Sequence, residues 1–307
     1  MDKTLCEQFD TLRKYLPDEL ETSSEHDFHQ NGNIKYYCPN GESGKTECKN
    51  YFDKIKAGCL WLFEQLFVKN KKNISTVEYI IIWLSYKLNQ KTYDEAKDLN
   101  DFYKKYIENN THYTSCNNDS GDCSNSLRNN TGYANYKEII DKKKKLLDTN
   151  IAKMSKIYDA FKPLCKVYTE LNTNNQCMTC LDNATKFINK YNELNDDSSI
   201  SGDSSCKQVL STLLSDYNNL KDSCDSNTVD CKNIQSLIST KTKGNDMQSS
   251  KEICVVTSPS LSIVNKLILA LSIFSVITIF LGIFFKCSLF VLRKRAQKQY
   301  LREKLKK

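Results

Sequence analysis

The sequence predicts a mainly α-helical protein, in which a cysteine-rich helical ectodomain is followed by a single transmembrane helix and a short basic tail. Glycine and proline number only nine and four in 307 residues, whereas sandwiches and barrels need turn residues every few positions. Fourteen cysteines are far more than a cytosolic protein usually contains. We expect an ectodomain over 1–239, a stalk over 240–265, a transmembrane helix over 266–287 and a cytoplasmic tail over 288–307.

Apolar residues in the first ninety or so positions recur at helical spacing. Leu5–Tyr15 is predicted as a short helix that Pro17 stops. A second helix carries apolar residues on one face from Phe52 to Phe67. A third spans Val77–Leu88, and its segment Tyr79–Leu84 is apolar on all sides. We therefore expect this third helix to form the centre of the core.

Later segments alternate between polar stretches and helices. Ser75 and Glu78 form a capping-box pattern before the third helix. The stretch Asn109–Thr131 is rich in Asn, Asp and Ser and is predicted as an exposed loop that does not pack. A long helix is predicted over Ile151–Leu171, where Pro163 should kink or split it.

The strongest signal is an apolar segment near the C-terminus. Leu267–Phe285 holds nineteen uncharged residues, of which fourteen are Leu, Ile, Phe or Val. At about 1.5 Å per residue it spans roughly 28 Å, close to the thickness of a hydrocarbon core. A buried globular helix seldom stays apolar on every face for this length. The transmembrane residues predicted along it are Leu267, Leu271, Phe274, Ile277, Leu281 and Phe285.

The net charge lies beside this segment. Arg293–Lys307 holds eight basic residues and one acid, so it contributes 8 − 1 = +7, the whole formal charge of the chain. The remainder is neutral and has no electrostatic footprint for nucleic acid. Positive residues stay on the cytoplasmic side, which predicts a cytosolic tail and an outward domain. The tail should also bind anionic lipid of the inner leaflet. Its basic residues include Arg293, Lys294, Arg295, Lys298 and Arg302.

A rival topology stays open at this point. Met1–Leu20 has no apolar core of a signal peptide, so the transmembrane segment itself would direct insertion. A tail-anchored protein with its main domain in the cytosol fits the same pattern. That arrangement would require eight basic residues to cross the membrane, which the positive-inside rule disfavours.

Cysteines bracket several of the polar loops, as Cys38 does with Cys48, Cys116 with Cys123, and Cys224 with Cys231. An outward domain enters an oxidising compartment, where such residues form disulfides. The connectivity is left open by the sequence. The candidates for disulfide bonds are Cys6, Cys38, Cys48, Cys59, Cys116, Cys123, Cys165, Cys177, Cys180, Cys206, Cys224 and Cys231.

No motif for catalysis or cofactor binding stands up to inspection. Cys177 and Cys180 form one zinc knuckle without a second pair at matching spacing. The segment Gly41–Thr46 resembles part of a phosphate loop, but Pro39 stands where the first glycine is required. Nothing resembles a nucleophile with a base and an orienting acid. The sequence therefore predicts no enzyme, no cofactor and no metal site.

Five segments in order carry a resemblance to a known family. They are Cys6 with Phe9-Asp-Thr-Leu-Arg-Lys-Tyr-Leu16, Gly58-Cys-Leu-Trp-Leu-Phe63, Val77-Glu-Tyr-Ile-Ile-Ile-Trp-Leu84, Tyr158 to Tyr168 around Cys165, and Arg293-Lys-Arg-Ala-Gln-Lys-Gln-Tyr-Leu-Arg-Glu-Lys-Leu305. In these the chain resembles the Plasmodium interspersed repeat (PIR) family of malaria-parasite variant antigens, of the rodent-parasite type. The resemblance covers essentially the whole chain.

The resemblance implies a variant protein of infected red cells, in the red-cell membrane or cytoplasm or in a parasite membrane. It implies immune evasion or interaction with a host-cell protein, and it carries over no catalytic or ligand-binding residues. Two alternatives remain: a specific adhesin for one host receptor, and a tail-anchored intracellular scaffold. Sequence variation is expected in Asn109–Thr131 and Asn195–Ser205, because both are polar.

Overall fold

A computed structural model describes residues 1–30, 32–40, 44–118, 121–171, 179–224 and 229–236. The chain divides into two compact units, Met1–Lys243 and Gly244–Lys307, and every described residue belongs to the first. The predicted stalk, transmembrane helix and basic tail lie outside the described residues, as does Cys177. Within the described ranges, none of the helices combines the length and apolar character needed to cross a membrane.

The first unit is helical, which confirms the predicted class. The helices are α1 (Lys3–Tyr15), α2 (Gly32–Lys35), α3 (Tyr51–Phe63), α4 (Val77–Asn89), α5 (Leu99–Tyr106), α6 (Thr111–Thr114), α7 (Ser124–Thr131), α8 (Tyr136–Asp141), α9 (Ile151–Glu170), α10 (Leu181–Asp196), α11 (Ser198–Ser201), α12 (Ser204–Ser223) and α13 (Val229–Ser236). Short turns η1 (Phe28–Gln30), η3 (Ile74–Thr76) and η4 (Lys144–Asp148) and a π-helical turn η2 (Glu64–Lys69) join them. Strands β1 (Asn117–Asn118) and β2 (Gly121–Asp122) form a small antiparallel pair.

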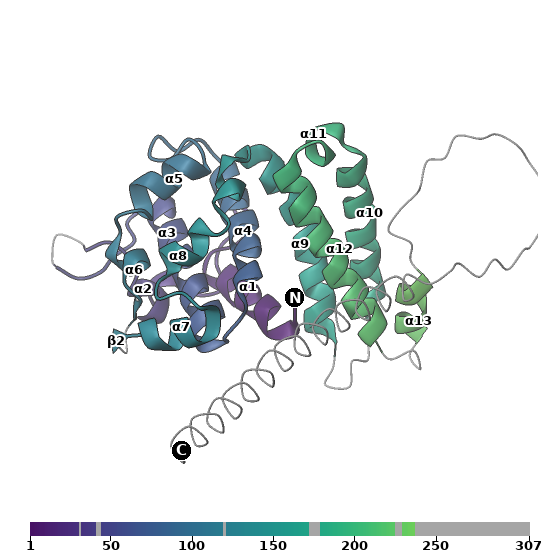
Figure 1. The fold of residues 1–307 in the computed structure, drawn as a ribbon, viewed down its shortest axis with the longest axis horizontal. Coiled ribbons are helices and arrows are strands. Elements are labelled where there is room, and N and C mark those ends of the chain that lie inside the picture. Colours follow the sequence, from purple (N-terminus) through teal and green to yellow (C-terminus); the bar gives the residue numbers. More distant parts are fainter. Residues whose placement is uncertain (31, 41–43, 119–120, 172–178, 225–228, 237–307) are drawn as a thin grey trace, which may run out of the picture. The chain divides into compact units, whose positions relative to one another are not determined.

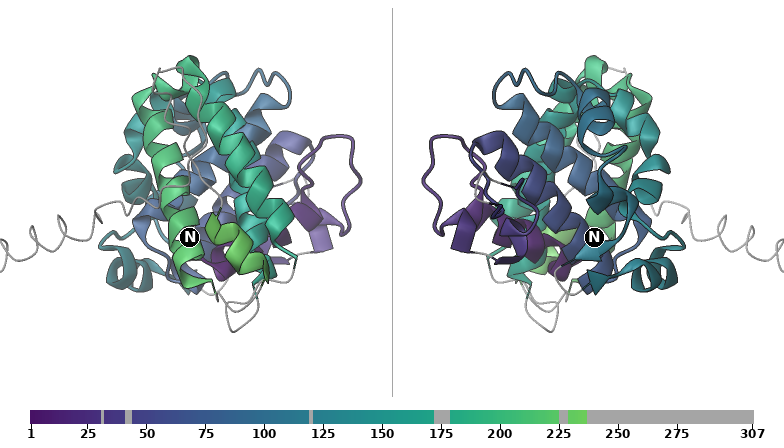
Figure 2. Two further views of the ribbon diagram at one scale, coloured as in Figure 1. Left: turned by 90° about the vertical axis from the view of Figure 1, so that its right-hand side faces the viewer. Right: turned by 90° about the vertical axis from the view of Figure 1, so that its left-hand side faces the viewer.

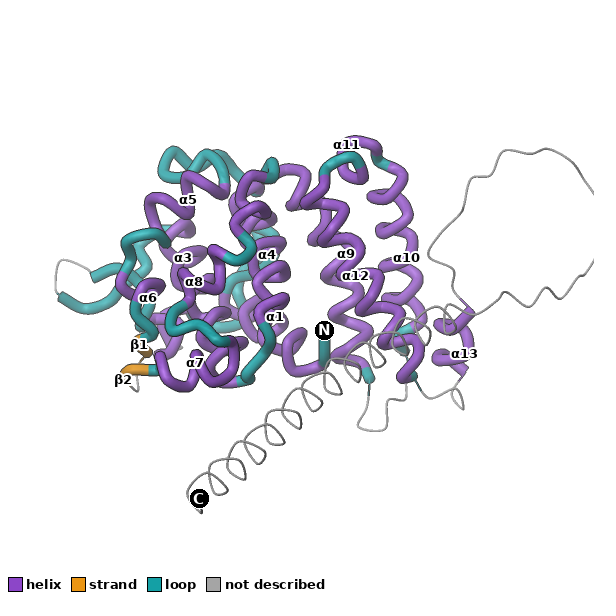
Figure 3. The backbone as a smooth tube through the Cα atoms, in the orientation of Figure 1, coloured by secondary structure: helices purple, strands orange, loops and turns teal. Residues whose placement is uncertain are grey.

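Two groups of helices meet along α4 and α9. Helices α2, α3 and α5 to α8 lie on one side, α9 to α13 lie on the other, and α1 and α4 run between them (Figure 1). Helix α9 packs against α1, α4, α10 and α12. The left view of Figure 2 looks onto this second group from the side, with the green helices α12 and α13 in front. The tube in Figure 3 shows how little of this unit is strand.

Helix α4 is buried on every face from Tyr79 to Leu84, as its sequence predicted. A close approach fixes its position. A Cβ atom added at Gly58 of α3 would lie 3.3 Å from the Trp83 ring and 3.4 Å from a methyl group of Leu12. Glycine at this position therefore lets α1, α3 and α4 pack against one another at short range.

The predicted capping box before α4 is wrong. Glu78 is 2 % exposed, and its Oε1 accepts from Lys143 Nζ at 2.7 Å and from Gln208 Nε2 at 2.8 Å. Asn73 caps the turn η3 that leads into α4, since its Oδ1 accepts from the Ser75 backbone N–H at 3.0 Å, and the N-cap residue of α4, Thr76, makes no side-chain capping hydrogen bond. The carboxylate of Glu78 binds partners distant in sequence, which a local motif cannot reveal.

The expectation that Asn109–Thr131 does not pack is also wrong. This segment contains α6, β1, β2 and α7, and Tyr113, Cys116 and Leu127 within it are buried. A few apolar anchors are sufficient to fold a polar segment onto the core, although its average composition is typical of a loop. In Asn195–Ser205, Ile200 of α11 is buried in the same way.

Pro163 does not split the long helix, since α9 runs without interruption from Ile151 to Glu170. Proline removes one backbone N–H donor and would weaken an isolated helix. Here α9 is packed against α4 on one side and α10 on another. Tertiary packing of this kind supplies most of a helix's stability in a folded protein.

Four disulfides join described cysteines. Cys6–Cys165 connects α1 to α9 across 159 residues, whereas the other three close short loops of seven to ten residues. The short-range pairs are Cys38–Cys48, Cys116–Cys123 and Cys224–Cys231. Cys180 is also disulfide-bonded. The cysteines that bracket polar loops are therefore partners, and the pair between helices is one that spacing could not reveal.

Two of the predicted disulfide cysteines, Cys59 and Cys206, carry free thiols. Both are buried within helices, and burial raises the pKa of the Cys59 thiol to about 12. A free cysteine in such a place acts as a small apolar side chain. The prediction failed because cysteine content indicates the oxidising compartment but not which thiols meet.

Removing the long-range disulfide by Cys6→Ala together with Cys165→Ala should lower the free energy of unfolding by about 5 kcal/mol, because the entropy lost by the unfolded chain grows with loop length. The matched variant, Cys116→Ala together with Cys123→Ala, removes a disulfide that closes a short loop. Its free energy of unfolding should fall by only about 2 kcal/mol. Urea denaturation of both variants under non-reducing conditions measures the difference. Equal losses would contradict the loop-length argument.

Candidate functional site

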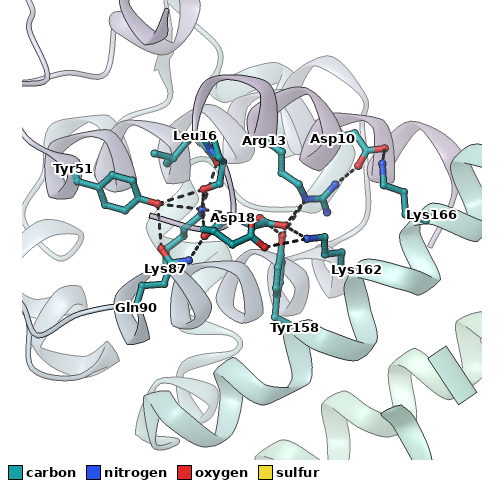
Figure 4. A network of polar contacts seen from close by, with 12 residues as sticks. Asp10, Arg13, Leu16, Asp18, Tyr51, Lys87, Gln90, Tyr158, Lys162 and Lys166 are labelled. Carbon is teal, nitrogen blue, oxygen red and sulfur yellow. Dashed lines mark hydrogen bonds and ion pairs between the residues drawn. The ribbon is translucent and has the colours of Figure 1, made fainter. Parts of the chain in front are cut away.

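A cluster of buried charges lies where α1 ends (Figure 4). The Lys87 ammonium group of α4 donates to the backbone carbonyls of Leu16 at 3.4 Å and Asp18 at 3.2 Å, and to that of Pro17. It also donates to the Tyr51 hydroxyl at 3.2 Å. Carbonyls at a helix C-terminus have no partner within the helix. A lysine from another helix therefore caps the end of α1.

The Asp18 carboxylate lies at the centre of this cluster. The Tyr158 hydroxyl donates to its Oδ1 at 2.7 Å, and Lys162 Nζ lies 2.8 Å from its Oδ2. Arg13 Nε is 3.2 Å from the same oxygen, and Lys87 Nζ is 4.0 Å from Oδ1. These groups come from α1, α4 and α9, so Asp18 joins the two groups of helices.

Burial and neighbouring charges act in opposite directions on these groups. Burial alone would raise the pKa of Asp18, but the charges of Arg13 and Lys162 and the Tyr158 hydroxyl hold it below its usual value. Burial lowers the pKa of Lys87 to about 8, although Asp18 opposes that shift. Both groups are therefore charged at neutral pH. The charge of each is stabilised by the other and by the polar groups around them.

This cluster is suited to holding helices together rather than to chemistry on a substrate. Asp18, Lys87 and Tyr158 are each at most 3 % exposed. Their polar atoms are directed at one another, which leaves no group free to accept a proton from a bound molecule. The sequence carries one signal for this cluster, the charged residue Lys87 in the same helix as the apolar segment Tyr79–Leu84.

A second buried carboxylate holds two of the disulfide-closed loops. Glu64, at the start of η2, is 1 % exposed. Its Oε2 accepts from the Tyr37 hydroxyl at 3.1 Å and its Oε1 from Asn118 Nδ2 at 3.3 Å. Lys69 Nζ lies 3.4 Å from Oε1. Tyr37 directly precedes Cys38 in the sequence, and Asn118 lies within the other loop, so both loops are fixed at one point.

The outer parts of these loops face solvent. Asn40, Gly44 and Lys45 are exposed in the first, and Gly121 and Asp122 are exposed in the second. The cysteines that close both loops are buried, whereas these residues between them are accessible. Surface loops held by a rigid scaffold are where proteins usually present variable or functional residues.

Described residues in and near the phosphate-loop-like segment make structural contacts. His29 accepts a hydrogen bond from the Cys48 backbone N–H through Nε2 at 3.3 Å. Thr46, at the end of the phosphate-loop-like segment, pairs with Asn40 in an isolated β-bridge. Across the described ranges, no group of three or more His, Cys, Asp or Glu residues is placed to hold a metal ion.

The family now follows from comparison. The sequence profile for "Plasmodium variant antigen protein Cir/Yir/Bir" matches residues 6–286. The chain belongs to this family. A solved structure, described as the structure of a Plasmodium PIR protein ectodomain, is 33% identical to this chain, with a TM-score of 0.52. That similarity covers 74% of this chain and 95% of that chain. No curated protein matches the chain.

Four of the five segments that carry the family resemblance form helices of the described unit: Phe9–Leu16 lies in and just after α1, Gly58–Phe63 in α3, Val77–Leu84 in α4 and Tyr158–Tyr168 in α9. They supply Arg13, Tyr158 and Lys162 to the Asp18 cluster and the Gly58 contact to the core.

Asp18→Asn should lower the free energy of unfolding by about 3–5 kcal/mol, because it leaves buried cations without their counter-charge. The pKa of Asp18 is lower in the folded state, so its contribution is present above its usual pKa of 3.8 and is lost as the pH falls through the folded-state value. Urea denaturation between about pH 2.5 and pH 7 should therefore show a flatter acid limb for the variant.

Asp182→Asn is the matched control, since Asp182 is exposed and pairs only with Lys186 in the next turn of α10. We expect its effect to be below about 1 kcal/mol. If Asp18→Asn were no more destabilising than this control, the Asp18 cluster would not be holding the helices together.

Proposed function

We propose that this chain is a non-enzymatic variant membrane antigen that displays a disulfide-stabilised helical ectodomain for immune evasion or host interaction. One observation carries the proposal. The chain belongs to a variant-antigen family, its core helices are fixed by buried contacts, and described residues of its disulfide-closed loops are exposed. Substitutions at those tips change the surface without disturbing the fold.

The disulfides support an outward ectodomain. Four described pairs form between cysteines that would stay reduced in cytosol. An outward ectodomain agrees with the excess of basic residues after Leu267–Phe285, which favours a cytosolic tail. The tail would then bind anionic lipid at the inner leaflet. This topology is part of the proposal, and it distinguishes the antigen from a tail-anchored scaffold with its domain in cytosol.

The polar surface supports display as well. Among residues whose positions are described, Leu20 is the only large apolar side chain that is exposed, at 39%. Contiguous apolar patches mark the sites where proteins join permanent assemblies. A surface without such a patch over the described ranges fits an ectodomain that is presented individually.

Labelling intact infected cells with a membrane-impermeant amine reagent, followed by peptide mass analysis, tests this proposal. Exposed ectodomain lysines such as Lys45 and Lys145 should be labelled before lysis. Tail lysines such as Lys298 and Lys304 should be labelled only after lysis and serve as an internal control.

Two outcomes would decide against the proposal. Labelling of Lys45 and Lys145 only after lysis would exclude display at the cell surface. Recovery of all cysteines as free thiols from protein alkylated within the cell would favour the intracellular scaffold, because disulfides require an oxidising compartment.

A further inference from the structure

A cavity of about 470 Å³ lies beside the neck of the Cys38–Cys48 loop. Helix α3 contributes Lys56 to its wall, α5 contributes Tyr106, and α6 contributes His112, while Tyr36 lies in the turn after α2. Its volume is within the range of small-molecule sites, which runs from about 300 to 1,000 Å³.

The wall formed by the loop neck is fixed by covalent and backbone bonds. The Cys38–Cys48 disulfide closes the neck. Asn40 and Thr46 form an antiparallel bridge inside it, and the backbone N–H of Glu47 donates to the Pro39 carbonyl at 2.9 Å. The described part of this wall is therefore built into the fold.

Several aromatic rings line the cavity, and two of them are partly accessible. Tyr36 and His112 are half-buried, and their rings meet edge to face with centroids 5.5 Å apart. Burial lowers the pKa of His112, so its imidazole is neutral at physiological pH. Partly exposed rings of this kind bind flat or ring-shaped ligands through their faces and edges.

Lys56 supplies a single charge to this surface. It is the only charged residue among the described residues that line the cavity. Its ammonium group lies 5.0 Å from the Tyr106 ring centroid and 2.9 Å from Asp53 Oδ1, and Asp53 does not line the cavity. Asp53 therefore takes up one of the three N–H donors of Lys56 from outside the cavity, and the remaining donors can pair with an anionic ligand inside it.

We propose that this cavity binds a small ring-bearing carboxylate, with the ring against Tyr36 and His112 and the carboxylate paired with Lys56. Two sources carry this chemistry: an aromatic carboxylic acid and an acidic sugar. Binding would be a property of the ectodomain in addition to display, and it requires no particular cell-surface location.

The experiment uses the full chain purified in mild detergent with its disulfides intact. Saturation-transfer NMR titrations measure phenylacetate, glucuronate and, as the uncharged match, phenylacetamide. We expect at least one acid to bind and phenylacetamide to bind about tenfold or more weakly than phenylacetate if phenylacetate is the acid that binds. Binding of phenylacetate alone identifies the aromatic source, and binding of glucuronate alone identifies the sugar.

Lys56→Met should weaken binding of the acid by about tenfold, since it removes the charge and keeps the length of the side chain. Lys54→Met is the matched control. Lys54 is on the same helix and also lies over an aromatic ring, that of Phe28 at 5.6 Å, but it is outside the cavity. Its substitution should leave binding unchanged.

The proposal is overturned if neither acid binds up to about 10 mM, or if a folded Lys56→Met chain binds the acid as tightly as the unchanged chain. Circular dichroism establishes whether that variant folds. If the variant does not fold, the unchanged chain is titrated with each acid and its uncharged match, which is phenylacetamide for phenylacetate and glucose for glucuronate. Equal binding of an acid and its match overturns the proposal. Preference for the acid supports it.

Discussion

A buried lysine and a buried aspartate fix the way the helices of this unit are assembled. Lys87 can remain charged in the core only because carbonyls at the end of α1 and the carboxylate of Asp18 surround its ammonium group. Neither charge would be tolerated alone, since desolvating an unpaired ion costs several kcal/mol. The arrangement specifies where α1 must end relative to α4 and α9, and the two groups of helices are built on those three elements.

The disulfides divide between this core and the surface. Cys6–Cys165 connects the same two helices, α1 and α9, that Asp18 bridges through Arg13 and Lys162. The three short disulfides act locally instead, each closing a polar segment on itself. Covalent and electrostatic constraints therefore coincide at the centre of the fold, while the loops carry their own. Substitution of an exposed residue such as Lys45 would leave these disulfides and ion pairs in place.

Local patterns predicted the elements whose contacts are local. Helix α4 could be recognised from Tyr79–Leu84, because a segment that is apolar on all sides must be buried. Glu78, Cys59 and the segment Asn109–Thr131 were misjudged for one shared reason: their environment comes from residues distant in the sequence. The Asp18 and Glu64 clusters were missed for the same reason, since each gathers side chains from three or more separated segments.

The neck of the Cys38–Cys48 loop shows how variation and constancy can coexist within a few residues. Tyr37 is held by Glu64 in the core, and Asn40 and Thr46 are paired across the neck. Exposed residues beyond that pairing, such as Lys45, contribute nothing to these bonds. Selection for a changing surface would therefore act on the tip, whereas the neck is constrained twice, by the core beneath it and by the cavity that it lines. If residues of the tip were exchanged, the recessed cavity would keep its shape while the surface around it changed.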